Sequence, residues 1–451
     1  MPSVVSLFSG CGGLDLGFRE CGFDLSYACD NDPAAVDCYA RNVDSRVFLR
    51  DVTSREFEAD ISQIGRCDLV LGGFPCQGFS KAGPKKISDI RNVLYRGICR
   101  AIAGLRPHLF IAENVDGISQ NFAGSYLNQI VNDFQQLGYK IEYRILDAAA
   151  FGVPQHRRRI FFVGVRQGTE IQFPWPQSTH KVKTRNGEFK LTQESIEELP
   201  LFQWRSAGQK AVLQPARTIK EAIAHLLELD DRIADHRLTN SWPKKYEAIF
   251  TAIKPGQKLC NVRHAPTSVH TWEIPGVFGS VTERERIVLE TISKHRRHKK
   301  YGNIPNGNPL PFDEIKRISG LGEITTEISA LLSKGYLKEK NAKYDLKGAM
   351  FCSGIFKRPL WEEPAPTVLT NFHNPRYFLH PLKNRPFSLR ECATLQGFPE
   401  TFAFSGTGTE VDLVSGYRLV GNAVPPILSR FLAAASQQLL EQIINKPIIK
   451  L

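Results

Sequence analysis

Short apolar runs alternate with amphipathic stretches along the first 165 residues. Apolar runs at 4–8, 25–29, 69–71 and 109–112 precede helical patterns at 14–21, 33–42, 92–105 and 126–137, respectively. A strand followed by a helix, repeated in this way, predicts βαβ units and therefore an α/β fold on a parallel sheet. The next two apolar runs, 141–146 and 160–165, have no helix between them. An antiparallel hairpin is therefore expected to end the sheet.

The pattern changes after residue 172. Residues 172–280 are irregular and contain eight prolines, but helical patterns return at 283–294, 312–318 and 324–334, with a hairpin pattern from 335. Three helices followed by a hairpin predict a winged helix. Near the C-terminus, Ser388 and Glu391 form a capping-box pattern that starts a helix, and 427–444 reads as a long amphipathic closing helix.

Charge is distributed unevenly along the chain. The formal net charge is +12, yet residues 1–175 contain 19 basic and 19 acidic side chains. Residues 176–383 carry 33 basic against 22 acidic side chains, which is nearly the whole excess. A balanced segment followed by a basic one favours a partner such as nucleic acid for the middle region, although a solvated basic surface explains the charge equally well.

Composition excludes several classes of protein. The 451 residues are 42% hydrophobic and 23% charged, which is typical of a globular protein and not of a disordered or fibrous one. We find no run of about 18 apolar residues, and the first residues lack the pattern of a signal peptide, so a cytosolic protein without a membrane partner is expected. The ten cysteines include no C-x-x-C pair, which predicts reduced thiols and no metal site.

The turn after the first predicted strand is a candidate cofactor site. It reads Phe8-Ser9-Gly10-Cys11-Gly12-Gly13, and Asp30 ends the second strand 20 residues after Gly10. A glycine-rich turn lets a ligand approach the backbone, and an acidic group after the second strand can bind ribose hydroxyls, so an adenosine-containing cofactor fits. Asp15 stands where a dinucleotide motif needs its third glycine, which disfavours a nicotinamide oxidoreductase. Taken alone, the glycines would indicate only a tight turn.

A cysteine in a glycine-bounded loop follows the fourth strand. The segment from Gly72 to Ser80 reads GGFPCQGFS and places Cys76 at the edge of the sheet where ligands bind. On geometry alone a buried structural cysteine is the commoner case. Glu113 ends the next strand, and Arg157 and Arg159 enter a later one, where alternation places them on one face with Gln155. Thiol, carboxylate and guanidinium groups are therefore expected to converge.

Six motifs in their order along the chain resemble those of the DNA (cytosine-5) methyltransferases of bacterial restriction-modification type. They are FSGCGGLDLGF, the PCQ loop at 75–77, ENV at 113–115, QHRRR at 155–159, RECATLQGFPETF at 390–402 and GNAVPP at 421–426. The resemblance covers residues 1–170 and 360–445. It implies a Rossmann-like methyltransferase sheet that uses S-adenosyl-L-methionine, with a second, smaller domain for target recognition.

The resemblance implies catalytic roles for Cys76, Glu113, Arg157 and Arg159. Cys76 would attack carbon 6 of cytosine, after which carbon 5 accepts a methyl group, loses its proton and the cysteine is released. Glu113 would contact the ring nitrogen and the exocyclic amine, and Arg159 would orient the base and activate the cysteine with help from Arg157. The cytosine must be flipped out of the duplex to be reached.

The resemblance also implies which residues hold the cofactor. They are Phe8, Ser9, Gly10, Gly12, Asp30, Asn31, Asp51, Val52, Pro75, Leu94 and Asn422. Asp51 is placed to bond the adenine amino group. Asp30 replaces the family's commoner glutamate, Asn31 occupies a position that is often aromatic, and Arg91-Asn92 stands where Arg-Gly is usual. Weaker cofactor binding is the expected consequence.

The same resemblance divides the chain into domains. Residues 1–171 would form the catalytic and cofactor-binding domain, 172–383 the target-recognition domain with a winged helix at 283–346, and 384–451 a return to the catalytic domain. The residues expected to contact DNA are Gln77, Ser80, Gln155, Arg296, Arg297, Lys299 and Lys300. The run 294–300 has five basic residues in seven. It would contact phosphates or only complement a helix end, and the helix at 324–334 would either read bases or only pack.

The expected function is methylation of a specific duplex DNA sequence by a monomer in the bacterial cytoplasm, associated with the nucleoid. A cognate restriction endonuclease, acting separately, would be the partner of such an enzyme. Two other functions remain open at this point. One is methylation of cytosine in tRNA, against which the long basic segment argues, and the other is a non-catalytic DNA-binding regulator, against which the complete set of site residues argues.

Overall fold

The computed structural model describes residues 1–75, 94–119, 125–169, 171–182, 213–238, 241–304, 307–347, 354–404 and 412–444. Cys76, Gln77 and Ser80 therefore lie outside the described residues. The chain forms two compact units. The first unit comprises Met1–Arg237, Glu362–Thr370 and Ser388–Leu451, and the second comprises Leu238–Trp361 and Asn371–Phe387. This division differs from the predicted domains, because 172–237 and 362–370 group with the first unit and 384–387 with the second.

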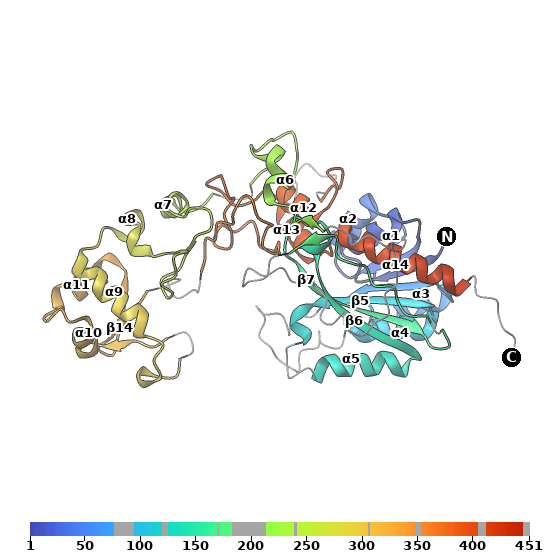
Figure 1. The fold of residues 1–451 in the computed structure, drawn as a ribbon, viewed down its shortest axis with the longest axis horizontal. Helices are drawn as coiled ribbons and strands as arrows, with labels where there is room; N and C mark the ends of the chain where they lie inside the picture. The colour runs from blue at the N-terminus through green and yellow to red at the C-terminus, as the bar shows by residue number, and fades with distance from the viewer. Residues whose placement is uncertain are drawn as a thin grey trace. The chain divides into compact units, whose positions relative to one another are not determined.

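A seven-stranded sheet forms the centre of the first unit (Figure 1). Its strands, in the spatial order β3-β2-β1-β4-β5-β7-β6, are β3 (Val47–Leu49), β2 (Asp24–Asp30), β1 (Ser3–Leu7), β4 (Leu69–Gly73), β5 (Leu109–Val115), β7 (Arg158–Arg166) and β6 (Tyr139–Asp147). All neighbours pair in parallel except β7, which runs antiparallel to both β5 and β6. The predicted α/β class and the antiparallel hairpin at the end of the sheet are both confirmed.

Helices cover both faces of this sheet (Figure 1). The helices of the first unit are α1 (Gly13–Glu20), α2 (Pro33–Asn42), α3 (Arg55–Ile64), α4 (Tyr95–Leu105), α5 (Ser125–Gln136), α6 (Ile219–Ile223), α12 (Leu389–Gln396), α13 (Leu413–Asn422) and α14 (Pro426–Ile444). Of these, α12 packs against both α6 and α13. Short 3₁₀ turns lie at Asp116–Ser119, Ala148–Phe151 and Ala224–Leu226, and β8 (His180–Lys181) pairs with β9 (Gln214–Pro215). Apolar side chains from α3, α4 and α5 pack against the sheet and form the main core, which includes Ile61, Ile98 and Phe134.

The closing helix α14 returns the C-terminus to the start of the chain, where it packs along α1. The contact is close because Gly17 of α1 has no side chain: a Cβ there would lie 2.6 Å from the backbone nitrogen of Arg430. The capping box predicted at Ser388 and Glu391 is confirmed at the start of α12. Asp32 caps α2 by accepting a hydrogen bond from the backbone N–H of Ala34.

The second unit has its own helices and strands. They are α7 (Lys244–Ala252), β10 (Lys258–Leu259), β11 (Ser268–Val269), α8 (Pro275–Phe278), α9 (Glu283–His295), β12 (Leu310–Pro311), α10 (Phe312–Ser319), α11 (Thr325–Lys334), β13 (Leu337–Lys340) and β14 (Lys343–Leu346), with 3₁₀ turns at Thr271–Glu273 and Lys299–Tyr301. β12, β14 and β13 form an antiparallel sheet in that order. The helices α9, α10 and α11 pack around a common core, which includes Val288, Ile315 and Leu331, respectively.

Among the helices in the described part of the chain, we find none that is long and apolar enough to cross a membrane.

Candidate active site at the carboxyl edge of the sheet

The carboxyl ends of the parallel strands bring the predicted site residues to one edge of the sheet. The antiparallel β7 begins at that edge, since Arg159 pairs with Val115 at the end of β5. The residues at the edge, with the strands to which they belong or which they follow, are 8–13 (β1), Asp30 (β2), Asp51 (β3), Pro75 (β4), Glu113 (β5) and Arg159 (β7). This edge is where open α/β sheets bind their ligands.

Glu113 and Arg159 form an ion pair at this edge. The Oε1 atom of Glu113 lies 2.9 Å from Nε of Arg159, and both side chains are largely buried. Burial raises the pKa of Glu113, and the Arg159 guanidinium partly offsets this effect. A carboxyl group in this state is suited to donating a proton or hydrogen bond to a ring nitrogen as well as to accepting one from an amine. The position of both groups at strand ends predicted that they would converge at this edge, and the structure brings them into contact.

The chain segment that leads to Cys76 is anchored beside Glu113. A Cβ on Gly73, the last residue of β4, would lie 3.4 Å from Oε2 of Glu113. One residue further, the carbonyl oxygen of Phe74 accepts a hydrogen bond of 3.1 Å from Nδ2 of Asn114. Asn114 belongs to the ENV motif, and the sequence alone predicts no role for it. Its contact with Phe74 fixes the exit of β4 against β5.

The glycine-rich turn after β1 is held by Asp30. The backbone N–H of Gly10 donates to Oδ2 of Asp30 at 2.9 Å, and that of Asp32 donates to Oδ1 at 3.0 Å. Burial raises the pKa of Asp30, and the hydrogen bond from Gly10 opposes the rise. Gly12 and Gly13 are needed for packing, because a Cβ at Gly13 would lie 2.3 Å from the carbonyl oxygen of Val424.

Gly10 differs from its neighbours in the turn. Its φ is +55°, and a Cβ built there would meet nothing within 4 Å. The backbone is thus open on that side, where a ligand can approach, and each oxygen of Asp30 keeps a lone pair for a hydroxyl donor. The residues present at this turn fit an adenosine-containing cofactor.

The other predicted cofactor residues are dispersed around the same edge. Oδ1 of Asp51 accepts hydrogen bonds of 2.7 Å from both the backbone N–H and the hydroxyl of Thr53, and the exposed side chain keeps its second oxygen for a ligand. Val52 is buried, and its side chain would clash with any Cβ on Gly97. The remaining ones are Phe8, Ser9, Leu94 and Pro75, which are partly or fully buried, and Asn31 and Asn422, which are exposed.

Arg157 is enclosed, and its hydrogen bonds go to backbone carbonyls and not to the Glu113 carboxylate. Its guanidinium donates to the carbonyl oxygens of Val368 at 3.1 Å and Gly421 at 2.8 Å, and complete burial lowers its pKa well below the ordinary value. β7 begins only at Arg158, so the predicted strand alternation does not extend to Gln155 and Arg157. Arg157 thus links two segments of the first unit that are distant in sequence, through hydrogen bonds to their backbone.

Gln155 is also fully buried. Its Oε1 accepts from the backbone N–H of Val368 at 2.9 Å, and its Nε2 donates to the carbonyl oxygen of Leu395 at 3.0 Å and to Gln396. This placement contradicts the expectation that Gln155 contacts DNA. The side chain satisfies backbone groups that would otherwise be buried without partners.

One ion pair near the cofactor residues was missed by sequence reasoning. Arg418 of α13 pairs with Asp32, two residues after Asp30. The two residues are 386 positions apart in the chain, so only the position of Arg418 four residues before Asn422 could have suggested the contact. The pair ties α13 to the start of α2.

The basic run 294–300 lies in the second unit and is not uniformly exposed. Arg296 is 2% exposed and pairs with Asp345, its Nε and Nη2 lying 2.8 and 2.9 Å from the two carboxylate oxygens. This burial contradicts the expectation that Arg296 contacts phosphate, because Asp345 takes up its charge. Arg297 and Lys299 are exposed, and the exposed Lys300 pairs with Glu314 at 2.9 Å.

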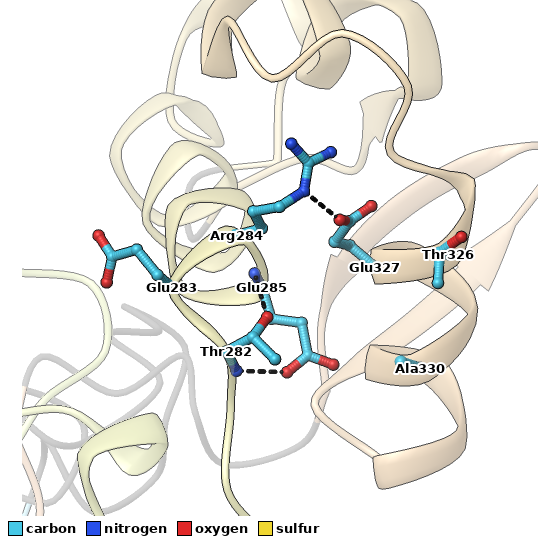
Figure 2. A pocket seen from close by; sticks show the side chains of 7 residues that line it. All are labelled: Thr282, Glu283, Arg284, Glu285, Thr326, Glu327 and Ala330. Atoms are coloured by element: carbon cyan, nitrogen blue, oxygen red, sulfur yellow. Dashed lines mark hydrogen bonds and ion pairs between the residues drawn. The ribbon is translucent and has the colours of Figure 1, made fainter.

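A surface pocket of the second unit lies between α9 and α11 (Figure 2). Figure 2 shows Arg284 paired with Glu327, and the capping box in which Thr282 and Glu285 exchange hydrogen bonds. With Glu283, three carboxylates line this pocket. Within the described residues, no group of three or more His, Cys, Asp or Glu side chains is arranged to hold a metal ion.

The fold and the site define an α/β protein of the methyltransferase type, with a glycine-rich turn after β1 that fits an adenosine-containing cofactor and a Glu–Arg pair at the carboxyl edge. The family model for C-5 cytosine-specific DNA methylases matches residues 3–438, and the chain belongs to that family. The protein is therefore a cytosine-5 DNA methyltransferase, and S-adenosyl-L-methionine is its methyl donor.

Curated relatives span nearly the whole chain. The Type II methyltransferase M.AgeI of Thalassovita gelatinovora is 29% identical over 95% of this chain and 98% of its own. The Type II methyltransferase M.BanI of Aneurinibacillus aneurinilyticus is 28% identical over 93% and 92%. A crystal structure described as a DNA modification methyltransferase encoded within an E. coli prophage covers 98% of this chain and 100% of that chain. Its TM-score of 0.52 at 22% identity supports the fold.

Proposed function

We propose that this enzyme methylates carbon 5 of a flipped cytosine within a specific duplex DNA sequence, through a covalent adduct on Cys76. The observation that carries the proposal is the ion pair of Glu113 and Arg159 beside the exit of β4. Phe74, which Asn114 holds, precedes Cys76 by two residues, a separation of at most about 7 Å along an extended chain.

Each catalytic residue has a distinct task in this reaction. The Cys76 thiolate attacks carbon 6, which makes carbon 5 nucleophilic enough to accept a methyl group. Glu113 contacts the ring nitrogen and the exocyclic amine while charge develops on the base. Arg159 holds the Glu113 carboxylate and orients the base. A proton acceptor then removes the proton from carbon 5, and elimination breaks the bond between carbon 6 and Cys76.

S-adenosyl-L-methionine supplies the methyl group in this reaction. The turn at 8–13 would hold it, with Gly10 providing open backbone and Asp30 accepting from the ribose hydroxyls. Asp51 would accept a hydrogen bond from the adenine amino group. Arg157, which contacts the backbone of two distant segments, is proposed as a positioning residue and not as one that touches the base.

We infer that the second unit is the target-recognition domain and that its residues 283–346 form a winged helix. The order of α9, β12, α10 and α11, followed by the antiparallel hairpin β13–β14, supports this assignment. In this arrangement α11 is the recognition helix at the major groove. The exposed side chains of Arg297, Lys299 and Lys300 would contact DNA phosphates.

The relatives named above are Type II methyltransferases, which supports a role in restriction-modification. A separate endonuclease would then cleave the same sequence when it is unmethylated. We propose that the enzyme acts as a monomer in the bacterial cytoplasm, associated with the nucleoid through its DNA substrate.

Mapping the methylated bases tests the proposal directly. The purified protein and a Cys76→Ala variant would be incubated with mixed-sequence duplex DNA and tritium-labelled S-adenosyl-L-methionine, and modified cytosines located by bisulfite sequencing. Label at one recurring motif, absent with the variant, is the expected result. Label on tRNA but not on duplex DNA would overturn the proposed substrate, and DNA binding without label would indicate a regulator.

A further inference from the structure

The hairpin β13–β14 ends in two lysines that face each other. Lys340 and Lys343 are directly opposite in the antiparallel pairing, separated by the two-residue turn Asn341-Ala342 with φ of +55° and +54°. At the other end of the hairpin, Leu337 and Leu346 are paired and buried in the core. The base of the hairpin is therefore fixed, whereas its tip, from 338 to 343, is exposed.

This pairing is unfavourable for the isolated hairpin. Like charges directly opposite one another on an antiparallel pair repel. Within the described part of the chain, neither Lys340 nor Lys343 takes part in an ion pair, so the repulsion is not relieved by a neighbouring carboxylate. An anion placed between the two ammonium groups would relieve it.

Most acidic side chains in residues 281–347 form ion pairs with basic groups other than Lys340 and Lys343. Residues 281–347 contain fourteen basic and nine acidic side chains. Seven of the acidic residues are in ion pairs within the same region: Glu283, Glu285, Glu290, Glu314, Glu323, Glu327 and Asp345. Three of them lie at the α9–α11 pocket (Figure 2). Within the described residues, the positive charges of Lys340 and Lys343 thus remain without an ion-pair partner.

We propose that the hairpin tip binds the phosphate backbone of duplex DNA through Lys340 and Lys343. The inference rests on the proposed function, because the duplex is the polyanion on which the enzyme acts. Two ammonium groups on a narrow turn can straddle a phosphate, and such contacts add affinity on every sequence without reading bases. The tip therefore positions the second unit on the duplex, and specificity comes from other side chains.

The test compares two double variants with the same change in net charge. The first is Lys340→Gln with Lys343→Gln. The matched control is Arg66→Gln with Lys140→Gln, since both residues are exposed and precede or begin strands at the amino edge of the sheet, away from the site. Binding of a fluorescent 30-base-pair duplex is measured from about 50 to 200 mM salt, with and without the target motif.

The hairpin variant should bind both duplexes more weakly by the same factor, on the order of tenfold at low salt, and its slope of log K against log salt should fall by about two. Without DNA its melting temperature should equal or exceed that of the wild type, because the repulsion is removed. A purely structural hairpin would instead melt earlier. A salt slope equal to that of the wild type, or a loss confined to the target motif, would overturn the inference. Wild-type protein that neither binds nor methylates duplex DNA would overturn the proposed function as well.

Discussion

At the scale of single residues, two opposing effects act on the charge of Glu113 in its ion pair with Arg159. Burial penalises the charged carboxylate, while the adjacent guanidinium favours it. The net result is a raised pKa, which favours a hydrogen bond donated to the ring nitrogen of cytosine, while the other carboxyl oxygen can accept one from the amine. The proposed role of Glu113 thus depends on its charge state and not only on its shape.

Replacing Glu113 by Gln keeps the shape and removes the charge. We expect kcat to fall by about 10²–10³-fold, the loss typical when one transition-state donor is removed, while binding of S-adenosyl-L-methionine is retained. Methylation kinetics and calorimetric titration of the cofactor provide the two measurements. Glu58→Gln on the exposed face of α3 is the matched control and should leave both unchanged. Unaltered kcat in the Glu113 variant would contradict the assigned role.

Asp15, in the first turn of α1, provides a prediction about pH. It is fully buried, accepts a hydrogen bond of 2.8 Å from the Ser6 hydroxyl, and has its pKa raised by burial from 3.8 to about 6. The folded protein binds this proton more tightly than the unfolded chain does. The resulting stabilisation is complete below about pH 4 and is lost as the pH rises through about 6. It amounts to about 3 kcal/mol at most.

The Asp15→Asn variant tests this directly. Its free energy of unfolding in urea should change less between pH 4 and 7 than that of the wild type, and the variant should be the more stable of the two at pH 7. Equal pH dependence in the two proteins would show that another group is responsible.

Residue contacts also show where sequence reasoning ends. The meeting of Glu113 and Arg159 follows from strand order, because neighbouring strand ends share an edge. The burial of Arg296 could not be predicted in this way. Its partner Asp345 lies 49 positions further along the chain, and the basic run around Arg296 indicates an exposed surface. Gln155 was misassigned for the same reason, since its partners are more than 200 residues away.

At the scale of elements, hydrophobic periodicity is sufficient to predict the helices that are amphipathic. The predicted helices at 283–294, 312–318 and 324–334 correspond to α9, α10 and α11 within one or two residues. The closing helix was predicted at 427–444 and begins one residue earlier. The apolar residues of each helix recur at helical spacing and pack against one core. The pattern in the sequence therefore corresponds directly to the helix that forms. How closely two such helices approach depends on single small residues instead.

Gly17 sets the approach of α1 to α14. Gly17→Ala should destabilise the protein by about 1–3 kcal/mol, because the added methyl group meets the backbone of Arg430, which cannot rotate away. Gly104→Ala on α4 is the control, since its Cβ would meet only the side chain of Ile61. That variant should lose less stability than Gly17→Ala, because a side chain can shift where a backbone cannot and alanine is the better helix former. Denaturant unfolding measures both, and equal stabilities would argue against a close helix contact.

At the scale of the whole molecule, the boundaries of the two units depend on long-range contacts. The segment 362–370 was predicted in the second domain because it precedes the RECATLQGFPE helix in sequence. It belongs to the first unit, where Gln155 and Arg157 bind the backbone of Val368. The pattern of apolar and polar residues marks the change at 172 but carries no information about such contacts. Each unit nevertheless has its own apolar core.

Two compact units predict two unfolding transitions, since cooperativity is a property of a single packed unit. S-adenosyl-L-methionine is expected to bind only the first unit, so at 100 times its Kd it should stabilise that unit by about 2.7 kcal/mol and leave the other transition in place. Scanning calorimetry with and without the cofactor measures both. Asp30→Ala should abolish the shift without removing either transition, because Asp30 holds the cofactor turn. A single unfolding transition, shifted as a whole to higher temperature by the cofactor, would instead show that the two units unfold together.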